Sequence, residues 1–209
     1  MELSNFISDA EVNSYLNASL AELHDIIVNT FDDYVSKSTT FTLTSSNAYT
    51  LPSDMLKLRL LSIYDGQRYV PLRALPLAER WRYTGSTAYS RGYDRRYVMM
   101  GPSLMVYPAE RAAGTYELVY VQQYVPVTVD ASVPFSGTGV PDQYWTEYAI
   151  VDTAIKLLQK EESDVSVLMA QKAALKKRIT DAAAMRDSGE PARILDIDGD
   201  TPQWPWWAR

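Results

Sequence analysis

Apolar residues recur at steps of three and four along residues 142–187, with one polar break at residues 161–164. This spacing is that of an amphipathic helix, so the stretch predicts two helices joined by a short turn. A connection this short makes the two helices antiparallel. The predicted stripes consist of Tyr144, Tyr148, Val151, Ile155 and Leu158 in the first helix and Val165, Leu168, Leu175, Ile179 and Ala182 in the second.

The polar break at residues 161–164 supplies a candidate helix cap, and one lysine interrupts the second apolar stripe. Ser163 or Asp164 can cap the second helix, because a side-chain oxygen accepts hydrogen bonds from the free N–H groups of a first turn. Lys172 stands at the one position of the second stripe where a further apolar residue is expected.

Another amphipathic helix is predicted near the N-terminus, from Ser8 to about Val35. Ser8 and Glu11 have the spacing of a capping box. The apolar stripe of this helix has no partner nearby in the sequence, so we expect it to pack on the helix pair of residues 142–187. Its stripe consists of Val12, Tyr15, Leu16, Leu20, Leu23, Ile27 and Phe31.

Between residues 38 and 138 the pattern changes to that of strands and turns. The turn Asp65-Gly66 predicts a hairpin, and Pro71 predicts that its second strand lies at a sheet edge. Residues 75–83 predict a short helix. Apolar residues on both faces of the last strand indicate a sheet that is covered on both sides or rolled. The predicted strands span residues 39–43, 57–64, 67–72, 97–100, 104–107 and 115–122.

These elements together predict an α+β fold, in which a helical core carries an inserted antiparallel β region and an extended C-terminal arm. Residues 1–37 form the first helix of the core, and residues 142–187 complete it. Residues 38–141 form the β-rich insertion. Residues 188–209 form the arm, because Gly189 and Pro191 stop the preceding helix.

Composition narrows the class of protein. The chain has 209 residues, 46% hydrophobic content and a net charge of -6. A negative charge argues against a DNA-binding surface that covers the protein. The absence of cysteine excludes disulfides and thiolate catalysis. No run approaches the roughly 20 apolar residues of a membrane span, so we expect a soluble protein made in a cytoplasm and no membrane partner.

The residue inventory offers little chemistry. His24 is the only histidine, and a lone helix histidine is interpreted as structural. The acids Glu161, Glu162 and Asp164 are interpreted as a turn before a helix rather than a metal site. Residues 196–200 lack the full spacing of a calcium loop, and no glycine-rich phosphate loop is present. We therefore expect no catalytic residue, no metal and no cofactor.

Arginine and aromatic residues gather in residues 79–97. Arginine binds phosphate and aromatic rings stack on bases, so one hypothesis is a nucleic-acid-binding module. The same residue types anchor protein interfaces, and the acidic chain favours this second interpretation, a subunit or partner contact. The candidate contact residues are Arg80, Trp81, Arg82, Tyr89, Arg91, Arg95 and Arg96.

The C-terminal arm carries three tryptophans within four residues, at Trp204, Trp206 and Trp207. An exposed cluster of this kind is adhesive, so we expect it to dock on another surface. The alternative is that the arm folds back on its own chain.

The runs AIVDTAIKLLQKEESDV (residues 149–165), LPSDMLK (residues 51–57) and LAER (residues 77–80) resemble the head-to-tail adaptor, or head-completion, proteins of tailed bacteriophages. The order of the elements is similar as well, over about residues 5–198, while the end from Trp204 has no counterpart in the family pattern. The resemblance implies a non-enzymatic structural protein of the virion, assembled as a ring, usually dodecameric, beneath the portal at one capsid vertex.

The same resemblance implies the partners. They are the portal protein, neighbouring copies in the ring, the next tail or connector protein, and DNA that passes through the lumen without specific binding. It also implies an arm that reaches the portal, which in this sequence gives the portal-binding residues Ile194, Leu195, Ile197, Trp204, Trp206 and Trp207.

Overall fold

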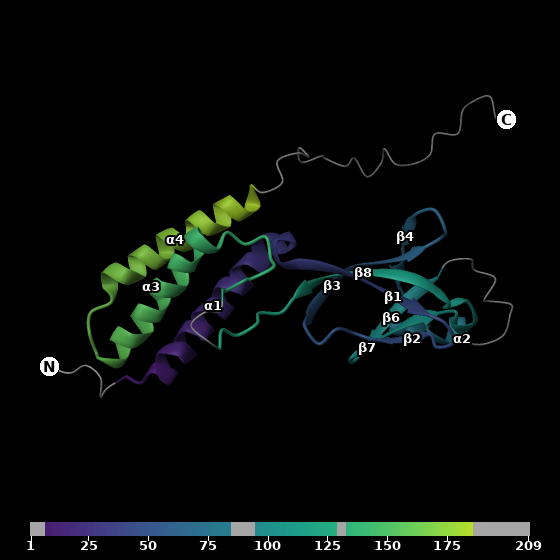
Figure 1. The fold of residues 1–209 in the computed structure, drawn as a ribbon, viewed down its shortest axis with the longest axis horizontal. Helices are drawn as coiled ribbons and strands as arrows, with labels where there is room; N and C mark the ends of the chain where they lie inside the picture. Colours follow the sequence, from purple (N-terminus) through teal and green to yellow (C-terminus); the bar gives the residue numbers. More distant parts are fainter. Residues whose placement is uncertain (1–6, 85–94, 129–132, 186–209) are drawn as a thin grey trace, which may run out of the picture.

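The computed structural model describes residues 7–84, 95–128 and 133–185. Figure 1 shows the long helices side by side at one end of an elongated molecule and the strands at the other end. The helices are α1 (Asp9–Phe31), α3 (Asp142–Lys160) and α4 (Ser166–Ala184). The predicted α+β fold and the packing of the N-terminal helix on the C-terminal pair are confirmed.

Helix α1 begins where the sequence predicts, because the Oγ of Ser8 accepts a hydrogen bond from the N–H of Glu11 at 3.3 Å. Leu20, Leu23 and Ile27 are buried on its predicted stripe. The prediction that it runs to Val35 is wrong: α1 ends at Phe31, and a 3-10 turn over Asp32–Val35 redirects the chain into the first strand.

The stripes of α3 and α4 meet those of α1 in one apolar cluster, which includes Val151, Ile155, Leu175 and Ile179. One predicted member is wrong by one position, since Ala182 is exposed while Ala183 is buried. The physical reason is the regular step of four from Leu175 and Ile179, which brings Ala183 to the inner face.

The turn between α3 and α4 is polar as predicted, but the expected cap at Ser163 or Asp164 is wrong, because the N-cap of α4 is Val165, which makes no side-chain cap hydrogen bond. Glu162 has a left-handed φ of 56°. The carboxylate of Asp164 accepts hydrogen bonds from the N–H of Ser166 at 2.9 Å and from its hydroxyl at 3.1 Å. Asp164 stands one residue before the N-cap and satisfies the first free N–H of α4 from there.

The β region consists of two sheets that share one apolar core. The first has the order β1-β8-β3-β4 and the second the order β2-β7-β6-β5. Tyr116 and Leu118 on β8 are buried in this core, whereas Val121 of the same strand belongs to the helical cluster. The strands are β1 (Ser36–Leu43), β2 (Ala48–Thr50), β3 (Met55–Tyr64), β4 (Tyr69–Pro71), β5 (Arg73–Ala74), β6 (Arg96–Met100), β7 (Ser103–Tyr107) and β8 (Gly114–Gln122).

Three details of the β region differ from the prediction. The edge position of the strand with Pro71 is confirmed, but β4 covers only part of residues 67–72. The two-residue strand β5 pairs parallel with β6, so the region is not purely antiparallel, and a strand this short has no periodicity to detect. The helix predicted for residues 75–83 is split into a 3-10 turn (Leu77–Glu79) and α2 (Trp81–Thr84).

Ion pairs and backbone contacts connect the helical part to the β region. Asp32, directly after α1, lies 3.1 Å from Arg59 Nη1 and 3.3 Å from Lys57 Nζ on β3. On the other side, the N–H of Gly139 donates to the carbonyl of Tyr34 at 2.7 Å. These contacts hold the end of α1 between the strands and the segment that leads into α3.

The packing makes a direct prediction about stability. Ile179→Ala removes a side chain on α4 that is 0% exposed, and should lower the free energy of unfolding by about 2–5 kcal/mol. Val167→Ala, on the same helix but 77% exposed, should change it by less than about 0.5 kcal/mol. Urea denaturation followed by circular dichroism measures both, and equal effects would contradict the assigned inner face of α4.

Candidate interaction surfaces and the polar core that positions them

Lys172 occupies its unexpected place on the inner stripe of α4 because two carboxylates meet it there. Its Nζ lies 2.7 Å from Asp152 Oδ1 on α3 and 3.0 Å from Glu22 Oε1 on α1. The ammonium also lies over the ring of Tyr148, 5.3 Å from its centroid. A single cation therefore joins all three helices.

A second lysine completes the network around Asp152. Lys156 Nζ lies 2.6 Å from Asp152 Oδ2 and donates to Ser19 Oγ at 2.9 Å. On the opposite side, the hydroxyl of Tyr148 donates to Glu22 Oε1 at 2.6 Å. The buried carboxylate thus faces two cations, as a buried charge requires.

These contacts fix the protonation states. Burial alone would raise the pKa of Asp152, but hydrogen bonds from Lys156 and Lys172 outweigh it and lower the pKa to about 2. For Lys172, burial acts to lower the pKa, and the bonds with Asp152 and Glu22 raise it above its ordinary value. Both groups are therefore charged at neutral pH.

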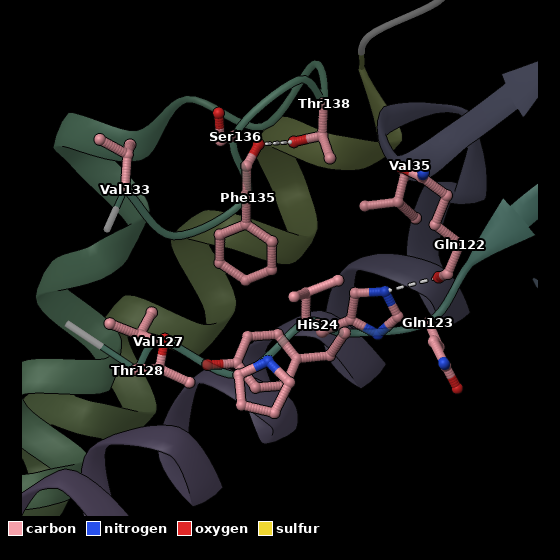
Figure 2. Close-up of a pocket in the computed structure, with 13 residues that line it drawn as sticks. His24, Val35, Gln122, Gln123, Val127, Thr128, Val133, Phe135, Ser136 and Thr138 are labelled. Atoms are coloured by element: carbon pink, nitrogen blue, oxygen red, sulfur yellow. Dashed lines mark hydrogen bonds between the residues drawn. The ribbon is translucent and has the colours of Figure 1, made fainter. Parts of the chain in front are cut away.

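A cavity of about 340 Å³ lies where the helices meet the β region (Figure 2). The ring of His24 stacks on that of Phe135, with centroids 6.3 Å apart and planes 5° apart. The Nε2 of His24 lies 3.0 Å from the carbonyl oxygen of Gln122, which only accepts, so this nitrogen carries the proton. The cavity is lined by His24, Val35, Gln122, Gln123, Tyr124, Val125, Pro126, Val127, Thr128, Val133, Phe135, Ser136 and Thr138.

His24 has a structural role in this arrangement, as its position in a helix predicts. It is buried, and burial lowers its pKa below the ordinary value, so the ring is neutral at pH 7. It joins α1 to the end of β8 through Gln122. The sequence places His24 in the first helix but does not reveal the cavity, because all its other lining residues except Val35 come from segments about 100 positions later in the chain.

Only some of the predicted contact residues of the 79–97 segment line the same surface hollow. Trp81 is 63% exposed, and the guanidinium of Arg82 lies 5.4 Å from the centroid of its ring. Arg80 and Trp81 border an open hollow of about 660 Å³, and Arg80 Nη1 donates to Met100 Sδ at 3.1 Å. The remaining side chains that line this hollow are Leu77, Met100, Met105 and Tyr107.

Arg95 and Arg96 line a different cavity, beside strands β4 and β5. The structure therefore does not bring the predicted contact residues into one site. Tyr89 and Arg91 lie outside the described residues, as do the predicted arm residues Ile194, Leu195, Ile197, Trp204, Trp206 and Trp207.

Within the described ranges, no three His, Cys, Asp or Glu side chains come together in a way that could hold a metal ion. Over the same part of the chain, none of the helices has the length and apolar character to span a bilayer. The described hollows thus present arginine, aromatic and apolar side chains, which suit contacts with other macromolecules.

A family model described as SU10 adaptor protein matches residues 2–195. The chain belongs to the SU10 adaptor protein family. Members of this family are structural adaptor proteins of bacteriophages, and the protein is accordingly a component of the virion. A search of curated proteins finds no match. The match to the SU10 adaptor family stops before Trp204, so the three tryptophans of the arm lie beyond it.

The polar core predicts a specific dependence of stability on pH. The pKa of Asp152 is depressed to about 2 in the folded state and is about 3.9 in an unfolded chain. Its contribution is therefore present above pH 4 and is lost as the pH falls toward 2.

Asp152→Asn isolates this contribution. The difference in free energy of unfolding between wild type and variant should be largest above pH 5 and should shrink by about 2 kcal/mol as the pH falls to 2. Urea denaturation at a series of pH values measures it. The control is Asp181→Asn, on the exposed face of α4. Its free energy of unfolding should depend on pH in the same way as that of the wild type. A constant difference for Asp152→Asn across the whole range would contradict the assigned ion pairs.

Proposed function

We propose that this adaptor forms a ring subunit of a phage head-to-tail connector, which binds the portal, extends the DNA channel and offers the platform for the tail. The observation that carries the proposal is the match of the SU10 adaptor family to residues 2–195. The fold supports it, since a helical core and a separate β region can serve two different contacts at once.

The helical core, residues 1–37 with 142–187, is proposed as the framework that packs against neighbouring copies, in a ring that we expect to be dodecameric. Support comes from the apolar side chains that α3 and α4 expose to solvent, which include Ile150, Val167 and Met169. Side chains of this kind suit a subunit contact when they lie on the outer face of a bundle.

The β region, residues 38–141, is proposed to contact the next tail or connector protein. The hollow beside Trp81 supports this role, because an exposed tryptophan with an arginine on its ring is a typical interface anchor. The apolar side chains of Leu77 and Met100 at the same hollow are also exposed and would be covered by a partner.

The arm, residues 188–209, is proposed to bind the portal through Ile194, Leu195, Ile197, Trp204, Trp206 and Trp207. Its sequence supports this role, because apolar residues in an extended arm become buried when the arm lies on another protein. Many arms acting together in a ring would strengthen modest contacts through multivalency.

The charge of the protein supports a conduit for DNA. Each phosphate contact adds affinity, and a net charge of -6 keeps such contacts few. The alternative, a nucleic-acid-binding module in residues 79–97, would need a continuous basic track. Among the described residues of that segment, Arg80 and Arg95 instead border separate hollows.

Electron microscopy of the protein mixed with its portal tests the proposal. Rings that cap the portal are the expected result, and a protein that stays monomeric and does not bind the portal would contradict it. Salt-dependent binding of short DNA duplexes in the absence of portal would instead support the nucleic-acid module.

Deletion of residues 204–209 tests the arm separately. Portal attachment, measured by co-sedimentation, should weaken, while the melting temperature should stay that of the full chain. Unchanged attachment would contradict the role of the arm, and a lower melting temperature would favour an arm that folds back on its own chain.

Trp81→Ala tests the β region. Attachment of the next tail or connector protein to portal-bound rings should weaken at least about tenfold, as expected for an interface anchor. The stability of the free subunit should change by less than about 0.5 kcal/mol because the side chain is mostly exposed. Leu56→Ala, another exposed apolar side chain of the β region, is the matched control and should leave attachment unchanged.

A further inference from the structure

Three arginines from two separate parts of the sequence line a cavity of about 390 Å³ at the edge of the β region. Arg73 comes from β5, Arg96 begins β6, and Arg95 precedes it directly. Strand β4, at the edge of its sheet, forms another wall. The cavity is lined by Ile63, Asp65, Val70, Pro71, Leu72, Arg73, Arg95 and Arg96.

The register of the short parallel pair places like charges opposite each other. Arg73 is the register partner of Arg96. Like charges in directly opposite positions destabilise a pair of strands. The strands β5 and β6 therefore bring together two positive charges at a cost, which a bound anion would offset.

One of these arginines has a donor without an acceptor. The Nε of Arg96 is buried and has no hydrogen-bond partner among the residues that the structure describes. A buried N–H of this kind costs free energy unless an acceptor reaches it. Arg95 is held in place beside it, since its Nε donates to the carbonyl oxygen of Arg111 at 2.6 Å.

The carboxylate that lines the cavity is already engaged by its own turn. Asp65 Oδ1 accepts hydrogen bonds from the N–H groups of Gln67 and Arg68, both at 2.9 Å. These backbone bonds lower the pKa of Asp65, so it is charged at neutral pH. One carboxylate bound to its own backbone leaves the three guanidinium groups with an excess of positive charge.

We propose that this cavity binds the carboxylate of an acidic segment from another protein chain. Guanidinium groups bind carboxylates through paired, charge-assisted hydrogen bonds. The walls also include Ile63, Val70 and Leu72, which suit the carbon atoms that carry a side-chain carboxylate. A DNA duplex offers a ridge of phosphates without such apolar atoms.

This site goes beyond the connector role and does not depend on it, since the free subunit should bind the segment without portal. A suitable probe is a fluorescein-labelled peptide with the sequence RILDIDGDT, which is residues 193–201 of this chain and alternates acids with apolar residues or glycine. The matched probe carries asparagine at the three aspartate positions. Fluorescence anisotropy with the full-length protein measures both affinities.

The acidic peptide should bind, and the asparagine peptide should bind at least about tenfold more weakly. Arg73→Gln and Arg96→Gln should each lower the affinity for the acidic peptide by a similar factor. Lys176→Gln, which removes an exposed positive charge on α4 outside the cavity lining, should leave the affinity for the acidic peptide unchanged. Arg73→Gln should also keep or raise the melting temperature of the free protein, because it removes the charge opposite Arg96.

Three outcomes would overturn the proposal. The first is equal affinity for the acidic and asparagine peptides, and the second is unchanged binding in both arginine variants. The third is displacement of the peptide by a short DNA duplex whose own binding is lost in Arg73→Gln and Arg96→Gln, which would make the cavity a phosphate site. Ring formation on the portal is a separate measurement, so its failure would leave this result standing.

Discussion

The contact of Lys172 with Asp152 and Glu22 is the constraint on which the helical core depends. The three residues come from three helices, and Glu22 and Lys172 lie 150 positions apart in the sequence. A buried ion pair is weak evidence for stability, because desolvation offsets most of the Coulomb attraction. The ion pairs also select the helix register. Any sliding of α4 along α3 would separate Lys172 from both carboxylates and leave Asp152 with Lys156 alone, whereas apolar stripes tolerate such shifts.

A fixed register of the helices matters because only a few short segments connect the helical core to the β region. The chain leaves α1 through Asp32 and Tyr34 and returns to α3 through the segment around Phe135. His24 joins α1 to β8 through the carbonyl oxygen of Gln122, and Val121 of β8 is buried among the helices. The position of the β surfaces is therefore set by the helices, as the proposed subunit with contacts at both ends would require.

Periodicity was sufficient to predict most elements but not the polar contacts. The three long helices, the edge strand with Pro71 and the strand of Tyr116 all follow from spacing and from turn residues. Lys172 was visible as an irregular position, yet its partners were not, because Asp152 and Glu22 resemble ordinary polar residues of amphipathic helices. The pair β5–β6 was missed for a different reason, since two residues carry no pattern and their register depends on the tertiary fold.

The arginines of residues 79–97 show that residues close in the sequence can belong to different surface sites. Residues 79–97 were interpreted as one contact segment, but Arg80 borders the hollow of Trp81 while Arg96 lines a cavity with Arg73. The hydrogen-bonding pattern of the sheet decides this, because β6 places Arg96 at one end and Met100 at the other. Charge is also distributed unequally: Lys156 and Lys172 of the helical core bind carboxylates of their own chain, whereas Arg73 and Arg96 oppose each other. We infer that the cavity of Arg73 and Arg96 retains electrostatic free energy that is available for a partner, whereas Lys156 and Lys172 have used theirs in folding.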